Sequence, residues 1–294
     1  MNRLLIVDGH AYAYRAFHAI RNLHGPEGRP TNAIYGFIKM LEKMRGVLEP
    51  EHLIVVWDGG LSAERMAAHP EYKVNRPEMP GDLRPQLDEI VEYLAAAGVA
   101  SHCGDQVEAD DYIACLARRA AAAGWHVVIA SADKDFMQLV SPLVGLWNPN
   151  DKAAGVVWSR EQVQAKTGVE PEQVADWLAL MGDAVDNIPG VPGVGPKTAA
   201  ELLQQFGSVA VLMDRLAEVK SERLRAALRA SAEVVSRNLR LVQLHEVACE
   251  FVPEQLAVRP ANREQLCELF RRWGFKGMLE GLERTLSGHQ AELI

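Results

Sequence analysis

The sequence predicts an α/β protein in which helices flank a mostly parallel central sheet and a helical region follows. Short, continuously apolar runs alternate with longer helical patterns in the first half of the chain, as in βαβ units. Continuous apolar character is typical of strands that helices cover on both faces. After Val157 only helical patterns with short turns remain. We therefore expect residues 1–160 to form an α/β core and residues 161–294 a helical region.

The periodicity places each element in order. Strands are expected at Arg3–Val7, His52–Trp57, Val99–Cys103, His126–Ala130 and Leu143–Trp147. Helices between them are expected at Ala11–Ile20, Thr31–Leu48, Asp82–Ala97, Glu108–Ala123 and Asp133–Val140. In the second part, helices are expected at Arg160–Lys166, Pro171–Met181, Lys197–Phe206, Ser221–Leu244 and Arg263–Trp273. Residues 59–82 lack periodicity and form an unusually long connection, which is either functional or loosely ordered.

Composition points to a soluble protein of the cytoplasm. The chain has 294 residues, of which 48% are hydrophobic and 24% charged, enough for a substantial core. Its four cysteines show no Cys-x-x-Cys spacing, so neither a zinc site nor a disulfide framework is indicated. The N-terminal apolar run has no signal-peptide pattern, and no segment approaches the ~18 apolar residues of a membrane span. We expect no membrane association.

The net charge of −8 argues at first against a polyanionic partner. The excess acid is local, however. Residues 191–294 hold 14 Lys and Arg against 13 Asp and Glu, which leaves 17 against 26 in residues 1–190. A net charge of −9 in the first two thirds of the chain therefore needs a local explanation.

Carboxylates follow the predicted strands and open the helices after them. The carboxyl ends of parallel strands meet at one edge of a sheet, where ligands bind. A further acidic pair, in "MGDAVDNIPG", could reach that edge from the helical region. The nine residues are Asp8, Asp58, Glu108, Asp110, Asp111, Asp133, Asp135, Asp183 and Asp186.

Nine converging carboxylates indicate a metal site. Two bare carboxylates about 5 Å apart repel by roughly 3 kcal/mol at an effective dielectric of about 20. All-oxygen ligands suit Mg²⁺ or Mn²⁺ rather than zinc, and a pair of such ions is the arrangement for phosphodiester hydrolysis. For any single residue the plainer interpretation is a cap or a first-turn acid that offsets the helix dipole. Three or four strand ends plus Glu-x-Asp-Asp and Asp-x-Asp patterns exceed what caps explain.

A second motif, "IPGVPGVGPKTAAELLQQFGS" at 188–208, predicts a glycine-rich hairpin that leads into a helix. Backbone amides there, the helix dipole and a lysine form a seat for phosphate, as in the helix-hairpin-helix module. A nucleotide P-loop is disfavoured because Pro196 interrupts the motif and no strand precedes it. A purely structural turn stays open. The candidate DNA contacts here are Gly193, Gly195, Lys197 and Thr198.

Other basic side chains are ambiguous on sequence alone. Arg15 lies one helix after Asp8, within reach of a phosphate near the acidic cluster. "EYKVNR" adds Tyr72, Lys73 and Arg76 in the irregular stretch, although an ordinary exposed loop would look the same. Five arginines between 223 and 240 are most simply a solvated helix face.

In this order, Asp8, "DGG", "VEADD", "SADKD", "GDAVDN" and "GVPGVGPKTAAELL" resemble the flap endonuclease-like 5′ nucleases, and among them the bacterial 5′→3′ exonuclease domain that begins DNA polymerase I. The resemblance spans about residues 3–285. It implies a PIN-like nuclease core and a C-terminal helix-hairpin-helix (H3TH) region. It also implies two divalent cations, one involving Asp8, Asp58, Glu108, Asp110 and Asp133, the other completed by Asp111, Asp135, Asp183 and Asp186. Asp58 and Asp111 are expected to act through water.

The same resemblance makes residues 59–82 an arch through which a single-stranded 5′ end threads. Lys73 and Arg76 would contact the scissile phosphate as electrostatic catalysts, beside Asp8 and Asp133. The hairpin would hold the downstream duplex, with a monovalent cation such as K⁺ at its carbonyls. The arch here is short and contains prolines, so a fully helical arch is not expected.

The sequence therefore predicts a 5′→3′ exonuclease and 5′-flap endonuclease acting in DNA replication and repair, including removal of RNA-primed ends. We expect a monomer that reads the shape of DNA rather than its sequence. Two alternatives stay open: a PIN-like ribonuclease, and a junction-binding module that kept the acidic cluster only for stability.

Overall fold

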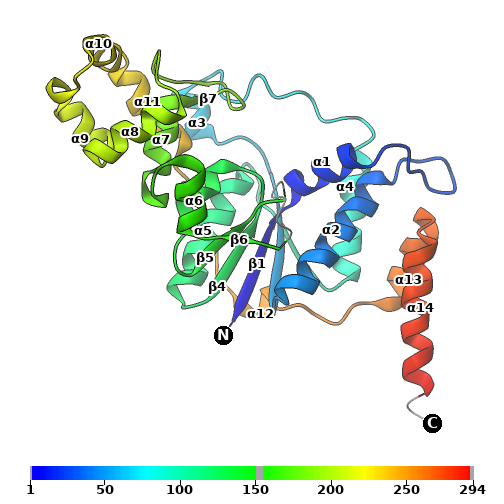
Figure 1. Cartoon of the computed structure of the whole chain (residues 1–294). Helices are drawn as coiled ribbons and strands as arrows, with labels where there is room; N and C mark the ends of the chain where they lie inside the picture. Colours follow the sequence, from blue (N-terminus) through cyan, green and yellow to red (C-terminus); the bar gives the residue numbers. More distant parts are fainter. Residues whose placement is uncertain (1, 150–154, 292–294) are drawn as a thin grey trace. The chain divides into compact units, whose positions relative to one another are not determined.

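The computed structural model describes residues 2–149 and 155–291, with side chains up to Arg284. Its contacts divide the chain into two compact units (Figure 1). Unit 1 contains the chain up to Trp57, Glu78–His102 and the chain from Val252 on. Unit 2 contains Asp58–Pro77 and Cys103–Phe251.

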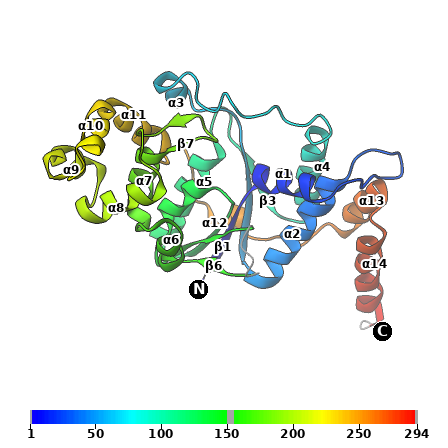
Figure 2. The same cartoon turned by 45° about the horizontal axis from the view of Figure 1, so that its top comes forward.

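Unit 1 holds the first strands of the sheet and their helices. β1 and β2 pair in parallel, with Leu5 opposite Leu53 and Val7 opposite Val55, and these four side chains are fully buried. Helix α13 packs on α4, as both views show (Figures 1 and 2). The elements are β1 (Arg3–Asp8), α1 (Gly9–Ala19), α2 (Asn32–Leu48), β2 (His52–Trp57), α4 (Arg84–Ala96), β3 (Ala100–Cys103, its last residue in unit 2), α12 (Pro253–Leu256), α13 (Arg263–Trp273) and α14 (Lys276–Ala291).

Unit 2 combines the remaining strands with a group of helices. β4 and β5 pair in parallel, and the short β6 pairs antiparallel with β5. Its strands and early helices are β4 (His126–Ala130), β5 (Val144–Trp147), β6 (Val157–Trp158), α3 (Ala63–Ala68), α5 (Ala109–Ala122), a 3₁₀ helix (Lys134–Leu139) and α6 (Arg160–Thr167). The rest are a 3₁₀ turn (Pro171–Gln173), α7 (Val174–Met181), β7 (Gly182–Asp183), β8 (Ile188–Pro189), α8 (Pro196–Phe206), α9 (Val209–Asp214), a 3₁₀ turn (Leu216–Glu218), α10 (Glu222–Ala230) and α11 (Ala232–Val242).

The predicted fold class is confirmed: parallel strand pairs predominate, and a helical region follows them. The strands expected at His52–Trp57 and His126–Ala130 have those bounds, as does the helix at Arg263–Trp273. The compact units do not follow the expected division near residue 160. The reason is that α13 near the C-terminus packs in unit 1, whereas β4, β5 and β6 pack with the helices of unit 2.

The structure differs from the expected elements in several places. The single helix at Ser221–Leu244 is two helices, because the backbone leaves helical geometry at Ser231 (φ −102°, ψ 10°). The segment after β4 is a 3₁₀ helix rather than an α-helix. The irregular stretch contains α3, and the long α14 extends beyond the last helix expected.

Candidate active site

Asp133 and Asp135 lie at the carboxyl end of β4, where the chain turns into the following 3₁₀ helix. Asp133 caps that helix, since its Oδ1 accepts a hydrogen bond from the backbone N–H of Asp135 at 2.9 Å. The Oδ1 atom of Asp135 is buried and has no hydrogen-bond partner among the described residues. A buried acceptor without a donor lowers the stability of the folded state, so this oxygen is a candidate to bind a ligand.

Asp183 is the last residue of β7 and Asp186 lies in the turn that joins β7 to β8, and both are buried. Asp183 Oδ1 accepts the N–H of Val185 and forms an ion pair with Lys134 Nζ at 2.9 Å. Asp186 Oδ1 accepts hydrogen bonds from the Nη2 and Nε of Arg76 at 2.7 and 3.2 Å. The helical part of the chain therefore contributes its acidic pair to unit 2, next to basic groups.

These carboxylates interact electrostatically. Burial raises the pKa of Asp133; the hydrogen bond from Asp135 N–H opposes this, and the charges of Asp186 and Asp183 add to it. Burial also raises the pKa of Asp135, further assisted by the charges of Asp133, Asp110, Asp186 and Asp183. The charges of five of the predicted site residues thus act together where negative charge is disfavoured. We call these five carboxylates, Asp110, Asp133, Asp135, Asp183 and Asp186, the acidic cluster.

Glu108, the N-cap residue of α5, is bonded to the segment predicted as the arch. Its Oε1 accepts the backbone N–H of Ser62 at 2.9 Å, and its Oε2 accepts from Lys73 Nζ and, at 3.2 Å, from Tyr72 Oη. Burial favours a higher pKa for Glu108, but the charges of Lys73 and Arg65 and these hydrogen bonds outweigh it and hold the pKa below its usual value. Glu108 is therefore ionised and saturated with donors.

Lys73 is held in place more firmly than a residue of an exposed loop. It is 5% exposed, and its backbone adopts the left-handed conformation (φ 58°), which is uncommon for a side chain of this size. Its N–H donates to the Asp186 carbonyl at 3.0 Å. Burial favours a lower pKa, yet the charges of Asp110, Glu108 and Asp186 raise it. Lys73 is thus a buried, charged lysine fixed between Glu108 and the acidic cluster.

The rest of the predicted arch divides into a buried and an exposed part. Tyr72 is buried, and Lys73 Nζ lies 4.9 Å from the centre of its ring. The side chain of Arg76 is 40% exposed while it pairs with Asp186. Only α3 is helical between residues 59 and 77, in keeping with the doubt that the prolines raised about a helical arch.

Sequence reasoning missed Arg65, a buried residue of α3. Its guanidinium makes a bidentate ion pair with Asp111, with Nη1 to Oδ2 at 2.6 Å and Nη2 to Oδ1 at 2.8 Å. Asp111 Oδ1 also accepts the N–H of His245 at 2.8 Å. An arginine in an aperiodic stretch gives no sequence signal for burial. Asp111, the third carboxylate of "EADD", was instead expected in the metal site.

Asp8 is the last residue of β1, and Asp58 directly follows β2. Asp58 is half-buried and accepts the N–H of Gly60 at 3.3 Å. Asp8, in unit 1, is buried and caps α1 by accepting the N–H of Ala11 at 3.0 Å. Arg15 lies half-buried on α1, where its charge lowers the pKa of Tyr12 against the larger effect of burial, which raises it. The roles predicted for these three residues stay predictions.

The hairpin between β8 and α8 separates structural glycines from accessible ones. A side chain at Gly190 would place its Cβ 2.1 Å from the Met181 carbonyl oxygen, so the backbones pack too closely for any other residue. Gly193 (φ 83°) and Gly195 have nothing within 4 Å of such a Cβ. Lys197, in the first turn of α8, is exposed, and Thr198 beside it is half-buried. The N-terminus of α8 is thus open to an anion.

The acidic cluster fits a hard divalent cation in its chemistry. Its donors are carboxylate oxygens, the ligands that Mg²⁺ and Mn²⁺ prefer, and Asp135 Oδ1 is buried without a donor. Within the described residues, no group of three or more His, Cys, Asp and Glu side chains is already arranged around one ion position. Five of the nine predicted ligands instead form ion pairs with lysine or arginine: Glu108, Asp110, Asp111, Asp183 and Asp186.

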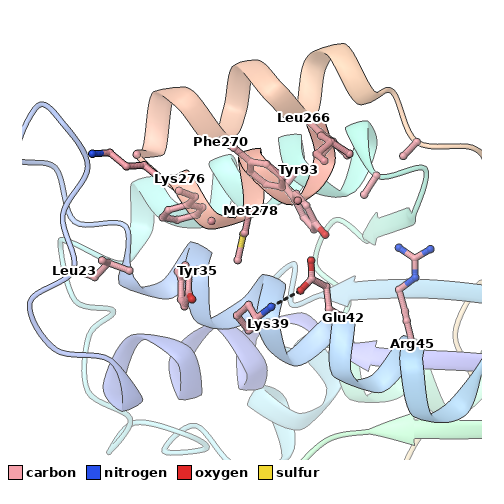
Figure 3. Close-up of a pocket in the computed structure, with 17 residues that line it drawn as sticks. Leu23, Tyr35, Lys39, Glu42, Arg45, Tyr93, Leu266, Phe270, Lys276 and Met278 are labelled. Atoms are coloured by element: carbon pink, nitrogen blue, oxygen red, sulfur yellow. Dashed lines mark hydrogen bonds and ion pairs between the residues drawn. The ribbon is translucent and has the colours of Figure 1, made fainter. Parts of the chain in front are cut away.

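A cavity of about 610 Å³ lies in unit 1 between α2, α4, α13 and α14 (Figure 3). Tyr35, Tyr93, Phe270 and Met278 give it a largely apolar lining, with charged groups that include the Lys39–Glu42 ion pair. It contains none of the predicted site residues. No helix in the described part of the chain is both long and apolar enough to span a membrane.

Two family models cover most of the chain. Residues 3–168 match the 5′-3′ exonuclease N-terminal resolvase-like domain, and residues 169–264 match the 5′-3′ exonuclease C-terminal SAM fold. The 5′-3′ exonuclease of Aquifex aeolicus is 37% identical over 97% of this chain and 96% of its own length. DNA polymerase I of Bacillus caldotenax is 38% identical over 99% of this chain, which spans only 33% of that polymerase.

Solved structures agree. The T5 5′-exonuclease with bound divalent zinc ions superimposes with a TM-score of 0.68 and 27% identity, over 83% of this chain and 90% of that one. The catalytic core of Rad2 in complex with DNA substrate gives 0.65 at 15% identity, over 92% of this chain and 88% of that one, a likeness of fold alone. With both domain models matched in order and a full-length relative above one third identity, this chain belongs to the 5′-3′ exonuclease family.

Proposed function

We propose that this chain is a metal-dependent nuclease that hydrolyses DNA phosphodiesters at free 5′ ends and 5′ flaps. The acidic cluster of unit 2 is the observation that carries the proposal, because Asp133 and Asp135 lie among like charges with raised pKa values, and the buried Asp135 Oδ1 lacks a donor among the described residues. Membership of the family supports it, as does the flap endonuclease of bacteriophage T5, whose structure holds DNA and metal ions.

The acidic cluster would hold two divalent cations, with Asp8, Asp58 and Glu108 as further predicted ligands. Two such cations, when bound, polarise the phosphoryl oxygens and lower the pKa of water. The chain's own part is to fix the carboxylates on rigid elements: Asp133 by its cap and Asp183 by its turn. Fixed charges of this kind need no rearrangement as the transition state forms.

Lys73 and Arg76 would neutralise charge on the phosphate as it is cleaved. Both are close to the cluster, through Glu108 and Asp186, and the charges of these carboxylates raise both pKa values against the opposing effect of burial. The two residues therefore remain cationic at neutral pH. Arg76 is the more accessible of the two and is the one expected to meet a 5′ strand first.

The hairpin before α8 would hold the duplex by its backbone. Gly193, Gly195 and Lys197 leave the amide end of a helix open to phosphate, a contact that carries no sequence information. Recognition would then depend on a duplex next to a free 5′ strand. A substrate of that shape arises in replication and repair, where displaced and RNA-primed 5′ ends must be removed.

A cleavage assay tests the proposal. With Mg²⁺, the purified chain should release labelled 5′ fragments from a DNA flap, and Asp133→Ala should abolish release. Because Asp133 lies in the cluster and not in the hairpin, the variant should still bind the flap in EDTA. Equal activity of wild type and variant would contradict the proposal. Preference for an RNA flap without a duplex would instead favour a ribonuclease.

A further inference from the structure

Arg65 uses every donor of its guanidinium in contacts with two other elements of unit 2. Its Nη1 and Nη2 hold both oxygens of Asp111, and Nη1 also lies 3.3 Å from Glu108 Oε1. Its Nε donates to the Leu241 carbonyl at 2.9 Å, and its Nη2 donates to the Gln243 carbonyl at 2.9 Å. Arg65 is 3% exposed. One side chain thus ties α3 to the start of α5 and to the end of α11.

Both carboxylate oxygens of Asp111 accept hydrogen bonds. Its Oδ2 accepts from Arg65, and its Oδ1 accepts from Arg65 and from His245 N–H. The bidentate arrangement is the strongest that an arginine and a carboxylate can make. Asp135, by contrast, keeps a buried oxygen without a donor.

We propose that Arg65 and Asp111 form a positioning pair that fixes the base of the arch segment, and that Asp111 is not a metal ligand. The inference rests on the proposed nuclease function, which it deepens. Arg65 lies on the short helix that leads to Lys73, and both side chains contact Glu108. By holding α3 against α5, the pair sets where Glu108 and Lys73 stand relative to the acidic cluster.

A purely structural salt bridge would look similar, so the test must separate stability from position. Breaking one partner of a buried pair leaves an uncompensated charge, whereas replacing both by apolar side chains of similar size is often nearly neutral. Arg65→Met and Asp111→Leu alone should each lower the unfolding temperature by about 10 °C. The double variant should lose less than the sum of the two shifts.

The double variant also leaves the net charge facing the cluster unchanged, which makes it suitable for measuring Mn²⁺ binding by calorimetry. We expect its Mn²⁺ dissociation constant to stay within about threefold of wild type, while Asp135→Asn weakens binding by at least about tenfold. If the double variant loses Mn²⁺ as Asp135→Asn does, Asp111 is a ligand and the inference is wrong.

Two measurements test whether the pair positions Glu108 and Lys73: the kinetics of flap cleavage and the tryptic cleavage of the arch segment. Well below the unfolding temperature, the double variant should show a kcat at least about tenfold lower on a DNA flap with little change in KM, since the charge that binds DNA is intact. Trypsin should cut after Lys73, which Val74 follows, at least about fivefold faster. Arg65→Lys keeps the positive charge but loses the two parallel hydrogen bonds of the guanidinium. Its kcat and its rate of tryptic cleavage should lie between those of wild type and those of the double variant.

Arg118→Met is the matched control. Arg118 lies on α5 and also reaches the segment after α11, through the Leu244 carbonyl and Glu246, but it does not contact Asp111. Its loss should leave kcat and tryptic cleavage unchanged. If the double variant has the kcat and the protease resistance of wild type, the pair has only a structural role. If the wild type cleaves no flap, the nuclease proposal fails, and the proteolysis and Mn²⁺ results still decide the inference.

Discussion

At the scale of single residues, the carboxylates of unit 2 are in two different states. Glu108 and Asp111 are paired with donors, whereas Asp133 and Asp135 are half-buried among like charges. The ion pairs of Glu108 and Asp111 favour the folded state. The negative charges of Asp133 and Asp135 disfavour it. An active site that must hold cations is expected to contain the second kind, because the uncompensated charge is what a cation relieves.

Asp135→Asn tests this distinction directly. The amide has the shape of the carboxylate but no charge, so in EDTA we expect the variant to be more stable than wild type by roughly 1–2 kcal/mol. Flap cleavage should fall by at least about 100-fold. Urea unfolding and a cleavage assay measure the two effects. A variant that is both less stable and fully active would show that the charge of Asp135 has no functional role.

The pH dependence of stability should carry the same signature. The folded-state pKa values of Asp133 and Asp135 are raised, so the stability they contribute is complete below the ordinary Asp pKa of about 4 and is lost as pH rises through the raised values. Glu108 has a lowered pKa and the opposite sign: its contribution is lost as pH falls through that lowered value. In EDTA, the stability advantage of Asp135→Asn over wild type should therefore grow as pH rises above the ordinary Asp pKa of about 4. An advantage that shrinks as pH rises would contradict the assignment.

At the scale of elements, the sequence predicted the strands β2 and β4 well because each is a short apolar run that a polar residue follows. Asp58 follows Trp57, and Ser131 follows Ala130. Helix interruptions were harder. Nothing at Ser231 breaks the periodicity of the arginine-rich stretch, so two helices read as one. The clustering of Asp133 with Asp183 followed from topology. The partner of Asp111 did not, because Arg65 and Asp111 are 46 residues apart and no periodic pattern joins them.

Two hairpin glycines allow a matched test of structure against contact. Gly190→Ala would force a methyl group against the Met181 carbonyl and should cost roughly 1–3 kcal/mol of stability. Gly195 has an ordinary backbone conformation (φ −101°) and open space, so Gly195→Ala should change stability by no more than about 0.5 kcal/mol. If the hairpin grips DNA, Gly195→Ala should still raise the dissociation constant for duplex DNA about tenfold. Unchanged binding would leave the hairpin a structural turn.

At the scale of the whole molecule, the chain passes between its two compact units several times, and the site residues divide with it. Asp8 and Arg15 belong to unit 1, and the acidic cluster belongs to unit 2. Sequence order alone suggested a simple division near residue 160, since only helical patterns follow Val157. The sequence could not show that the last helices pack in unit 1. The apolar face of a helix predicts that the face is buried, but it does not indicate which element covers it.

Divalent ions should therefore stabilise the folded chain through unit 2. A ligand that binds only the folded state adds about 2.7 kcal/mol at 100 times its dissociation constant. Titration of Mg²⁺ or Mn²⁺ into the EDTA-treated chain should raise the unfolding temperature by several degrees. Asp135→Asn should remove most of that gain, because the amide has no negative charge with which to bind the ions. Arg118→Met, which leaves the cluster intact, should keep it. A gain of the same size in Asp135→Asn would mean that the ions bind elsewhere, and the acidic cluster would then have to be explained without them.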